Sequence, residues 1–310
     1  MHSMLHDVSY DPTSGSIACA DASQQALAPT GDPGRFWGDL GQIECAYDIS
    51  QATVWTFMQF HGRPSFNPDL LVDFHGWGRH IRTLKAEMGE AFKYVVLCSR
   101  HAGIFCLGGD LDAFSTYIRN GDREALTAYG RSCIRILHDN WSVSKHGVIS
   151  IGLAQGDALG GGFESLLSFD ILCAERGARF GFPEQLFGLF PGMGALTFLG
   201  RKLGFAKAEQ LVRSGKLLTA EELYEMGVVH ILAEPGTGVT AINKYIHRHG
   251  SRHAAELCML GASKRANPIP FDELDDIVKF WVDACMTLGK HDLAVMQRLI
   301  TAQARLDSAA

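Results

Sequence analysis

The amino-acid sequence predicts an α/β fold, because short apolar strands alternate with helix-forming segments along most of its 310 residues. Residues 93–98 (KYVVLC) form a continuous apolar run of the length expected for a strand buried on both faces. Residues 70–88 place apolar side chains near the 3.6-residue period of an amphipathic helix. Glycine-rich turns separate such runs from the helices that follow them, which is typical of strand-to-helix connections.

The expected elements follow this alternation in chain order. A β-hairpin is expected over residues 43–60, where β-branched and aromatic residues gather. Helices are predicted at residues 70–88, 112–120, 123–140 and 161–169, and strands at residues 93–98, 147–154 and 171–174. After residue 200 we expect mainly helix, at residues 206–214, 220–226 and within 239–304, with one short strand at 228–232.

Composition and charge exclude several classes of protein. The formal net charge is −6, which disfavours nucleic acid as a general partner. The eight cysteines form no C-x-x-C pair and are expected to be reduced thiols of a cytoplasmic protein. The most apolar long stretch, residues 148–169, is interrupted by polar residues and glycines, so we expect no membrane span. Residues 1–40 lack a sustained period and the pattern of a secretion signal, and we predict a flexible N-terminal extension.

Glycine is unusually frequent, and the excess lies near two predicted strand-to-helix turns. The chain has 34 glycines, about 11% against a typical value of roughly 7%. Residues 160–162 (GGG) open a predicted helix, where free backbone N–H groups favour an anion or a developing oxyanion. Residues 108–109 (GG) form a similar turn upstream. The two turns together could supply two N–H groups to one carbonyl oxygen, although glycines at such turns can serve close packing alone.

Two glutamates stand in apolar surroundings after the second glycine turn. Glu164 lies in a stretch with no Lys or Arg, and Glu184 lies between phenylalanines and directly after a proline. Burial raises the pKa of a carboxyl toward the range useful for proton transfer, so the two acids are candidates for a general acid/base pair. The alternative is that each caps a helix or pairs with an arginine such as Arg176, Arg179 or Arg201.

Five stretches resemble the enoyl-CoA hydratase/isomerase (crotonase) superfamily. They are residues 105–111 (FCLGGDL), 155–164 (QGDALGGGFE), 180–184 (FGFPE), 192–195 (GMGA) and 214–229 (SGKLLTAEELYEMGVV), in family order. The resemblance implies a crotonase-like core of ββα repeats wound as a spiral, over residues 41–235, and a C-terminal helical layer over residues 236–310. It also implies an oxyanion hole formed by the N–H groups of Gly109 and Gly161, with Glu164 and Glu184 as the catalytic acids.

A closer resemblance is to the diffusible-signal-factor synthases, through residues 106–111, 158–164, 183–195, 280–289 and 296–299. It implies dehydration of a 3-hydroxyacyl thioester, carried by acyl carrier protein or by CoA, to a cis-2-enoyl thioester. Hydrolysis of the thioester would then release a fatty-acid quorum-sensing signal. No metal and no further cofactor is expected. The sequence departs from these relatives at Cys106 and Gly188, which leaves the substrate and its chain length open.

Further residues are candidates for binding. Met193, Trp281 and Leu299 suit the wall of an acyl-chain pocket, or else are plain core. Arginines recur at roughly helical spacing at positions 119, 123, 131 and 135, as either a solvated helix face or a surface for an acidic carrier protein. The superfamily resemblance implies a homotrimer or a larger homo-oligomer.

Two other functions fit the same sequence. One is an ordinary enoyl-CoA hydratase of fatty-acid metabolism. The other is a catalytically silent relative that binds a signalling sensor or a carrier protein. The presence of both Glu164 and Glu184 favours an enzyme over a silent relative.

Overall fold

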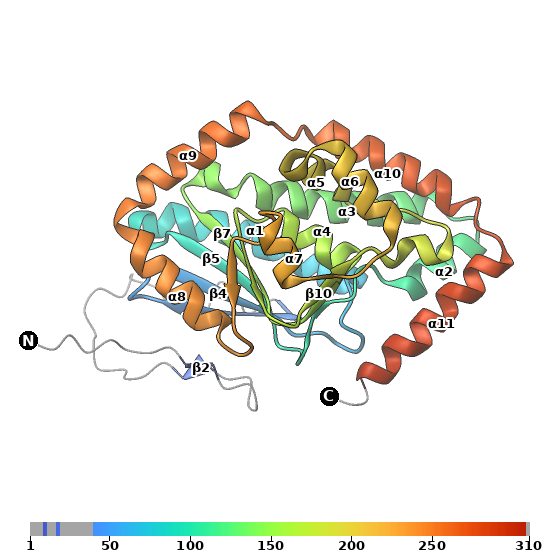
Figure 1. Ribbon diagram of the computed structural model, residues 1–310, viewed down its shortest axis with the longest axis horizontal. Helices are drawn as coiled ribbons and strands as arrows, with labels where there is room; N and C mark the ends of the chain where they lie inside the picture. Colours follow the sequence, from blue (N-terminus) through green and yellow to red (C-terminus); the bar gives the residue numbers. More distant parts are fainter. Residues whose placement is uncertain (1–8, 11–16, 19–39, 308–310) are drawn as a thin grey trace, which may run out of the picture.

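The computed structural model describes residues 9–10, 17–18 and 40–307, and its main body contains two sheets surrounded by helices (Figure 1). The larger sheet has six strands in the order β12-β9-β7-β5-β4-β3. These are β3 (Ile43–Asp48), β4 (Thr53–Met58), β5 (Tyr94–Ser99), β7 (Ile149–Ala154), β9 (Ile171–Glu175) and β12 (Ile231–Ala233). β3 and β4 form the predicted hairpin, and every other neighbouring pair in this sheet is parallel.

The smaller sheet has four short strands in the order β11-β10-β8-β6. They are β6 (Ile104–Cys106), β8 (Asp157–Leu159), β10 (Arg179–Gly181) and β11 (Leu218–Thr219). Each of the first three follows a strand of the larger sheet and precedes a helix, so the chain repeats a strand, strand, helix unit. This is the crotonase-like arrangement that the sequence resemblance implied. The small sheet itself was not predicted, because three-residue strands are too short to show alternation.

The helices that cover the sheets largely confirm the predicted pattern. They are α1 (Pro68–Met88), α2 (Leu111–Arg119), α3 (Arg123–Trp141), α4 (Gly161–Leu167), α5 (Ala195–Leu203), α6 (Phe205–Ser214), α7 (Ala220–Glu225), α8 (Gly238–His249), α9 (His253–Ala266), α10 (Phe271–Cys285) and α11 (Lys290–Asp307). Short 3-10 helices lie at η2 (Gly89–Ala91), η3 (Val143–His146), η4 (Pro183–Phe187) and η5 (Gly250–Arg252).

The structure differs from the sequence analysis at two elements. Helix α5 was not predicted. The strand predicted at residues 228–232 begins at Ile231, because the N–H groups of Val228 and Val229 donate to the carbonyl of Leu223 and close the end of α7. Their apolar side chains are therefore core residues of a helix end and not of a strand.

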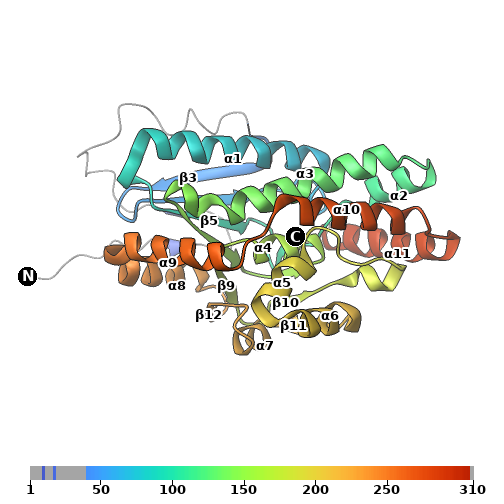
Figure 2. The same ribbon diagram turned by 90° about the horizontal axis from the view of Figure 1, so that it is seen from above.

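The larger sheet is buried on both faces. Seen from above, α1 and α3 lie on one side of it and α8 and α9 on the other (Figure 2). Val54 and Val95 belong to the cluster that includes α1 and α3, whereas Trp55 and Val96 pack with Ile242 of α8. This alternation of faces explains the continuous apolar runs in the sequence.

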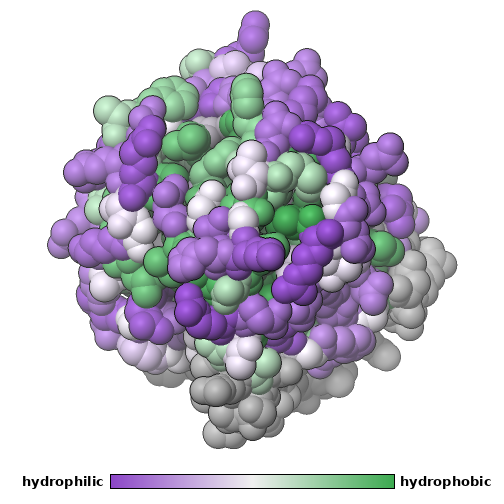
Figure 3. Space-filling model, turned by 90° about the vertical axis from the view of Figure 1, so that its right-hand side faces the viewer, coloured by the Kyte–Doolittle hydropathy of each residue, from purple (hydrophilic) through white to green (hydrophobic). Residues whose placement is uncertain are grey.

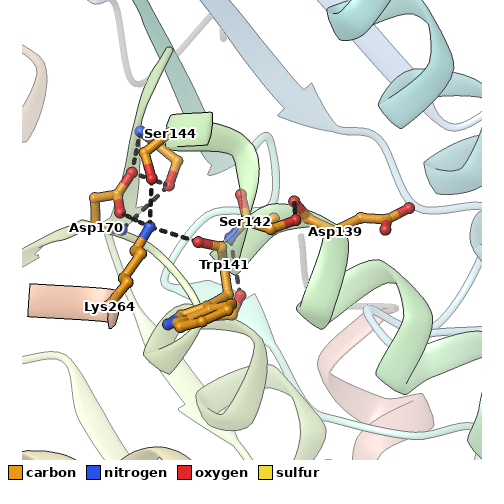
Figure 4. Close-up of polar contacts among 9 residues, drawn as sticks. Asp139, Trp141, Ser142, Ser144, Asp170 and Lys264 are labelled. Carbon is orange, nitrogen blue, oxygen red and sulfur yellow. Dashed lines mark hydrogen bonds and ion pairs between the residues drawn. The ribbon is translucent and has the colours of Figure 1, made fainter. Parts of the chain in front are cut away.

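A buried ion pair fastens α9 to this body. The ammonium of Lys264, on α9, contacts the carboxylate of Asp170, donates to the carbonyl of Trp141, and lies 2.8 Å from the hydroxyl of Ser144 (Figure 4). The other carboxylate oxygen of Asp170 accepts from the N–H of Ser150 at 3.0 Å. The pair thus ties α9 to the start of β9 and to β7, because Asp170 directly precedes the first and Ser150 belongs to the second.

The predicted domain division at residues 41–235 and 236–310 stays a prediction. Strands β1 (Ser9–Tyr10) and β2 (Ile17–Ala18) pair with each other. The prediction for residues 1–40 otherwise lies outside the described residues. No helix in the described part of the chain is both long enough and apolar enough to span a bilayer.

Candidate active site

The two glycine turns lie side by side, because β6 and β8 are neighbouring parallel strands and each turn follows one of them. A Cβ placed on Gly161 would be 3.5 Å from the backbone nitrogen of Gly109, and one on Gly108 would be 3.1 Å from that of Gly161. Gly108 and Gly160 have positive φ angles of 98° and 51°, conformations that L side chains rarely adopt. Glycine is thus required both by the backbone and by the close approach of the turns.

The N–H groups of Gly109 and Gly161 are the two donors that the sequence placed in an oxyanion hole. Gly161 is the first residue of α4, where backbone N–H groups have no partner within the helix. Neither N–H donates to another group in the described part of the chain. Both residues line the same cavity, so two free donors face one space.

Glu164 lies on α4 and is 1% exposed. Its Oε1 accepts hydrogen bonds from the N–H groups of Met193 (2.8 Å) and Ala195 (2.9 Å), which fix the carboxyl at the start of α5. Burial raises the pKa of Glu164, and these N–H groups oppose that rise because they favour the ionised form.

Glu184 lies on η4, after β10, and its carboxyl lies beside the same turn. A Cβ on Gly160 would be 2.4 Å from its Oε1, so the carboxyl rests against the glycine backbone. Its Oε2 is buried and has no hydrogen-bond partner among the described residues. Burial, and then the negative charge of Glu164, raise the pKa of Glu184. The two acids therefore titrate as a pair above the ordinary carboxyl range.

A cavity of about 620 Å³ contains all seven site residues that the sequence singled out. Gly109, Gly161, Glu164 and Glu184 lie on its wall, together with Met193, Trp281 and Leu299. Trp281 and Met193 are buried, and α11 supplies Leu299. The structure thus brings these seven residues, which are spread over positions 109 to 299 of the sequence, to one cavity.

Several wall residues were missed by sequence reasoning. The cavity is also lined by Leu107, Leu111, Phe114, Phe187, Leu189, Ala302 and Gln303. Phe114 had a usable signal, because it lies one helical turn after the aspartate that follows the first glycine turn. Ala302 and Gln303 had none, since their small or polar side chains look like an ordinary helix surface.

The three arginines considered as partners of the acids have other partners. Arg176 pairs with Glu221 and Glu234, Arg179 with Asp157, and Arg201 with Glu273. The alternative in which an arginine neutralises Glu164 or Glu184 is therefore not realised among the described residues.

The predicted row of arginines is also divided among different roles. Arg123 pairs with Asp283 and Arg131 with Asp275, both acids being on α10. The guanidinium of Arg135 lies over the ring of Phe271, 5.0 Å from its centroid. Only Arg119 among the four lines a surface groove, which is described below.

Comparison with known proteins identifies the family. The sequence pattern described as enoyl-CoA hydratase/isomerase matches residues 81–237. The chain belongs to the enoyl-CoA hydratase/isomerase family. Mevalonyl-coenzyme A hydratase SIDH of Beauveria bassiana is 34% identical over 144 residues, which are 44% of this chain and 49% of that protein. Short-chain-enoyl-CoA hydratase of Clostridium acetobutylicum is 40% identical over 85 residues, 27% of this chain and 33% of that one. The chain thus spans less than half the length of these curated relatives.

Solved structures of the family share the fold at lower identity. DspI of Pseudomonas aeruginosa superposes with a TM-score of 0.64 and 20% identity, covering 78% of this chain and 94% of that one. Human mitochondrial delta3-delta2-enoyl-CoA isomerase superposes with a TM-score of 0.70 and 15% identity, covering 86% and 99%. These likenesses establish the crotonase fold.

Proposed function

We propose that this enzyme dehydrates a 3-hydroxyacyl thioester to a cis-2-enoyl thioester and then hydrolyses the thioester, releasing a free fatty acid that serves as a signal. The observation that carries the proposal is that buried Glu164, half-buried Glu184 and the glycines of the two N–H groups line one cavity. A pair of acids favours addition or removal of water, because that reaction moves one proton to oxygen and another from carbon.

In the dehydration, the thioester carbonyl oxygen accepts from the N–H groups of Gly109 and Gly161. One glutamate removes the proton from Cα, and the electron pair moves toward the carbonyl to give an enolate that the two donors stabilise. The other glutamate protonates the 3-hydroxyl, the Cβ–O bond breaks, and water leaves as the double bond forms. The raised pKa values of both glutamates suit this exchange of protons at neutral pH.

In the hydrolysis, the same two N–H groups would hold the oxyanion of a tetrahedral intermediate. A glutamate takes a proton from water as the water oxygen bonds to the carbonyl carbon. The C–S bond then breaks, and the thiol leaves with a proton. No nucleophile beyond water is needed for this step.

The wall of the cavity suits a hydrocarbon chain. Met193 lies beside the donor turn, because a Cβ on Gly161 would be 2.9 Å from its Sδ. Trp281 of α10 packs against Gly192, and Leu299 of α11 lines the cavity. Met, Trp and Leu side chains favour an apolar ligand and adapt to its shape.

A groove beside the cavity supports a phosphate-bearing or acidic carrier as the other half of the substrate. It lies between α2 and α11, is lined by Arg119, Lys290 and Arg298, and shares Ala302 with the cavity. No carboxylate of the described residues forms an ion pair with any of these three cations. The face over α2, α10 and α11 is hydrophilic around an inner hydrophobic region (Figure 3). An acyl carrier protein is the carrier we propose, because cations without partners attract acidic surfaces.

The deciding experiment supplies 3-hydroxyacyl carrier protein to the pure enzyme and analyses the products. Free cis-2-enoic acid is the expected product. Recovery of only the thioester, with reversible hydration, would instead identify an ordinary enoyl-CoA hydratase, the function that the curated relatives favour. If neither Glu164→Gln nor Glu184→Gln lowered product formation, the acid/base assignment would be wrong.

We also propose that the enzyme forms a homo-oligomer, in the cytoplasm. Met259 on α9 and Phe280 on α10 are 63% and 66% exposed, and such apolar side chains favour contact with another copy. Analytical ultracentrifugation is expected to show a trimer or a larger species, and a monomer at micromolar concentration would refute this part of the proposal.

A further inference from the structure

We propose that Tyr129 is a positioning residue of the oxyanion hole, which holds the turn that presents the N–H of Gly109. The inference rests on the proposed function for its catalytic consequence, but its structural basis is separate. Tyr129 lies on α3, is 5% exposed, and is not among the described residues that line the cavity.

The hydroxyl of Tyr129 joins two segments of backbone. It donates to the carbonyl of Phe66 and accepts from the N–H of Asp110 at 3.3 Å. It is buried, so water cannot readily replace either contact. A buried hydroxyl that satisfies one acceptor and one donor makes both hydrogen bonds costly to lose.

The segment before α1 holds the same turn from its other side. The N–H of Leu107 donates to the carbonyl of Pro64 at 2.7 Å, and the N–H of Phe66 donates to the carbonyl of Gly108 at 2.8 Å. The carbonyl of Gly108 and the N–H of Gly109 belong to one planar peptide unit and point in opposite directions. Binding the carbonyl therefore directs the N–H toward the cavity.

Tyr129 controls the next peptide unit, which contains the carbonyl of Gly109 and the N–H of Asp110. The peptide units on both sides of the Gly109 Cα are thus held, one by Phe66 and one by Tyr129. The hydroxyl also holds the carbonyl of Phe66, so the two restraints are linked. Arg63 contacts the Asp110 carboxylate at 3.2 Å and restrains the end of the turn.

Aromatic packing leaves the turn little room to relax. A Cβ on Gly109 would be 2.5 Å from the ring of Phe114, whose ring centroid lies 4.9 Å from that of Tyr129 in an edge-to-face pair. The Phe114 ring also meets Trp281 at 5.1 Å. The turn is therefore packed against an aromatic row, while its hydrogen bonds to Tyr129 and Phe66 set its orientation.

Tyr129→Phe tests the inference, because it removes the hydroxyl and keeps the ring. Removal of an oxyanion-hole donor lowers kcat by roughly 100- to 1000-fold, and a donor that is present but less well oriented should cost less. We expect kcat to fall by about 10- to 100-fold with KM changed by no more than about twofold. The pH profile should keep its shape, because the two glutamates are unchanged.

Tyr94→Phe is the matched control. Tyr94 is also buried, on β5, but its hydroxyl has no hydrogen-bond partner in the part of the chain that the structure describes. Its removal should leave kcat, KM and the pH profile as in the wild type. A loss of kcat in Tyr94→Phe equal to that in Tyr129→Phe would show a general effect of deleting buried hydroxyls and would overturn the inference.

Amide hydrogen exchange separates this inference from the proposed function. In Tyr129→Phe the N–H of Asp110 loses its acceptor and should exchange at least about tenfold faster, whereas Tyr94→Phe should exchange as the wild type does. Failure of the wild type to convert any thioester would refute the proposed function and leave this measurement to judge the positioning role. Unchanged exchange at Asp110, or an unchanged kcat in an active enzyme, would overturn it, as would a shifted pH profile.

Discussion

Replacement of Glu184 by glutamine should stabilise the enzyme and inactivate it. The carboxyl of Glu184 lies against Gly160 and close to Glu164, and its buried Oε2 has no hydrogen-bond partner within the described ranges. Glutamine keeps the shape and removes the charge. Loss of a general acid or base should lower kcat by about 100- to 10,000-fold.

The stability change should depend on pH, in a direction that follows from the raised pKa. The unfolded chain releases the Glu184 proton near the ordinary carboxyl range, whereas the folded enzyme keeps it to higher pH. Between these two ranges the native state binds more protons, so the stability of the wild type falls as pH rises. A carboxyl whose pKa is one unit higher in the folded than in the unfolded chain costs about 1.4 kcal/mol of stability once it is ionised in both states, and Glu184→Gln should recover at least about that amount at pH 8.5 because it removes the buried charge.

Thermal unfolding at pH 5 and pH 8.5 measures this difference. A chain of this size gains about 2–4 °C in Tm per kcal/mol, so Glu184→Gln should melt several degrees above the wild type at pH 8.5 and close to it at pH 5. Glu225→Gln, at an exposed glutamate on α7, is the control and should show neither change. An equal or lower Tm for Glu184→Gln at pH 8.5 would refute the reasoning from burial.

Two further substitutions test the fold around the site. Gly162→Ala should cost about 3 kcal/mol or more, because its Cβ would be 2.2 Å from the carbonyl oxygen of Cys106. Gly250→Ala, whose Cβ would meet nothing within 4 Å, should be tolerated, and equal urea midpoints for the two variants would contradict the clash. Lys264→Met should cost about 3–5 kcal/mol, since it leaves the Asp170 carboxylate buried without its cation. Denaturation that is unchanged by Lys264→Met would show that the pair contributes nothing.

Sequence patterns located the parts of the fold that repeat over many residues. Helix α1 and strand β5 were predictable because their apolar periodicity extends over several turns or a whole strand. Strands β8 and β10 were not, although the site depends on them. Phe180 pairs with Ala158 and Gly181 with Leu159, a parallel register between segments about twenty residues apart. That pairing places η4 beside α4, and no local pattern in either segment predicts the pairing.

The candidate site was likewise predictable from the sequence only in part. The two glutamates and the glycine turns were recognisable from their neighbours in the sequence, and the structure places them on one cavity. The proposed positioning role of Tyr129 was not recognisable, because in the sequence Tyr129 looks like any apolar residue of an amphipathic helix. Its role depends on the carbonyl of Phe66, which lies 63 residues away in the chain. The ion pairs of Arg123 and Arg131 likewise depend on acids of α10 that lie more than 140 residues away in the chain.

Helix α11 supplies Leu299, Ala302 and Gln303 to a cavity whose donors and acids come from residues 109–184. The last helix therefore contributes side chains to the space offered to a substrate but none of the candidate catalytic groups. If the cavity holds an acyl chain as proposed, exchange of side chains along one face of the last helix can change the chain length that fits, while Glu164 and Glu184 stay in place.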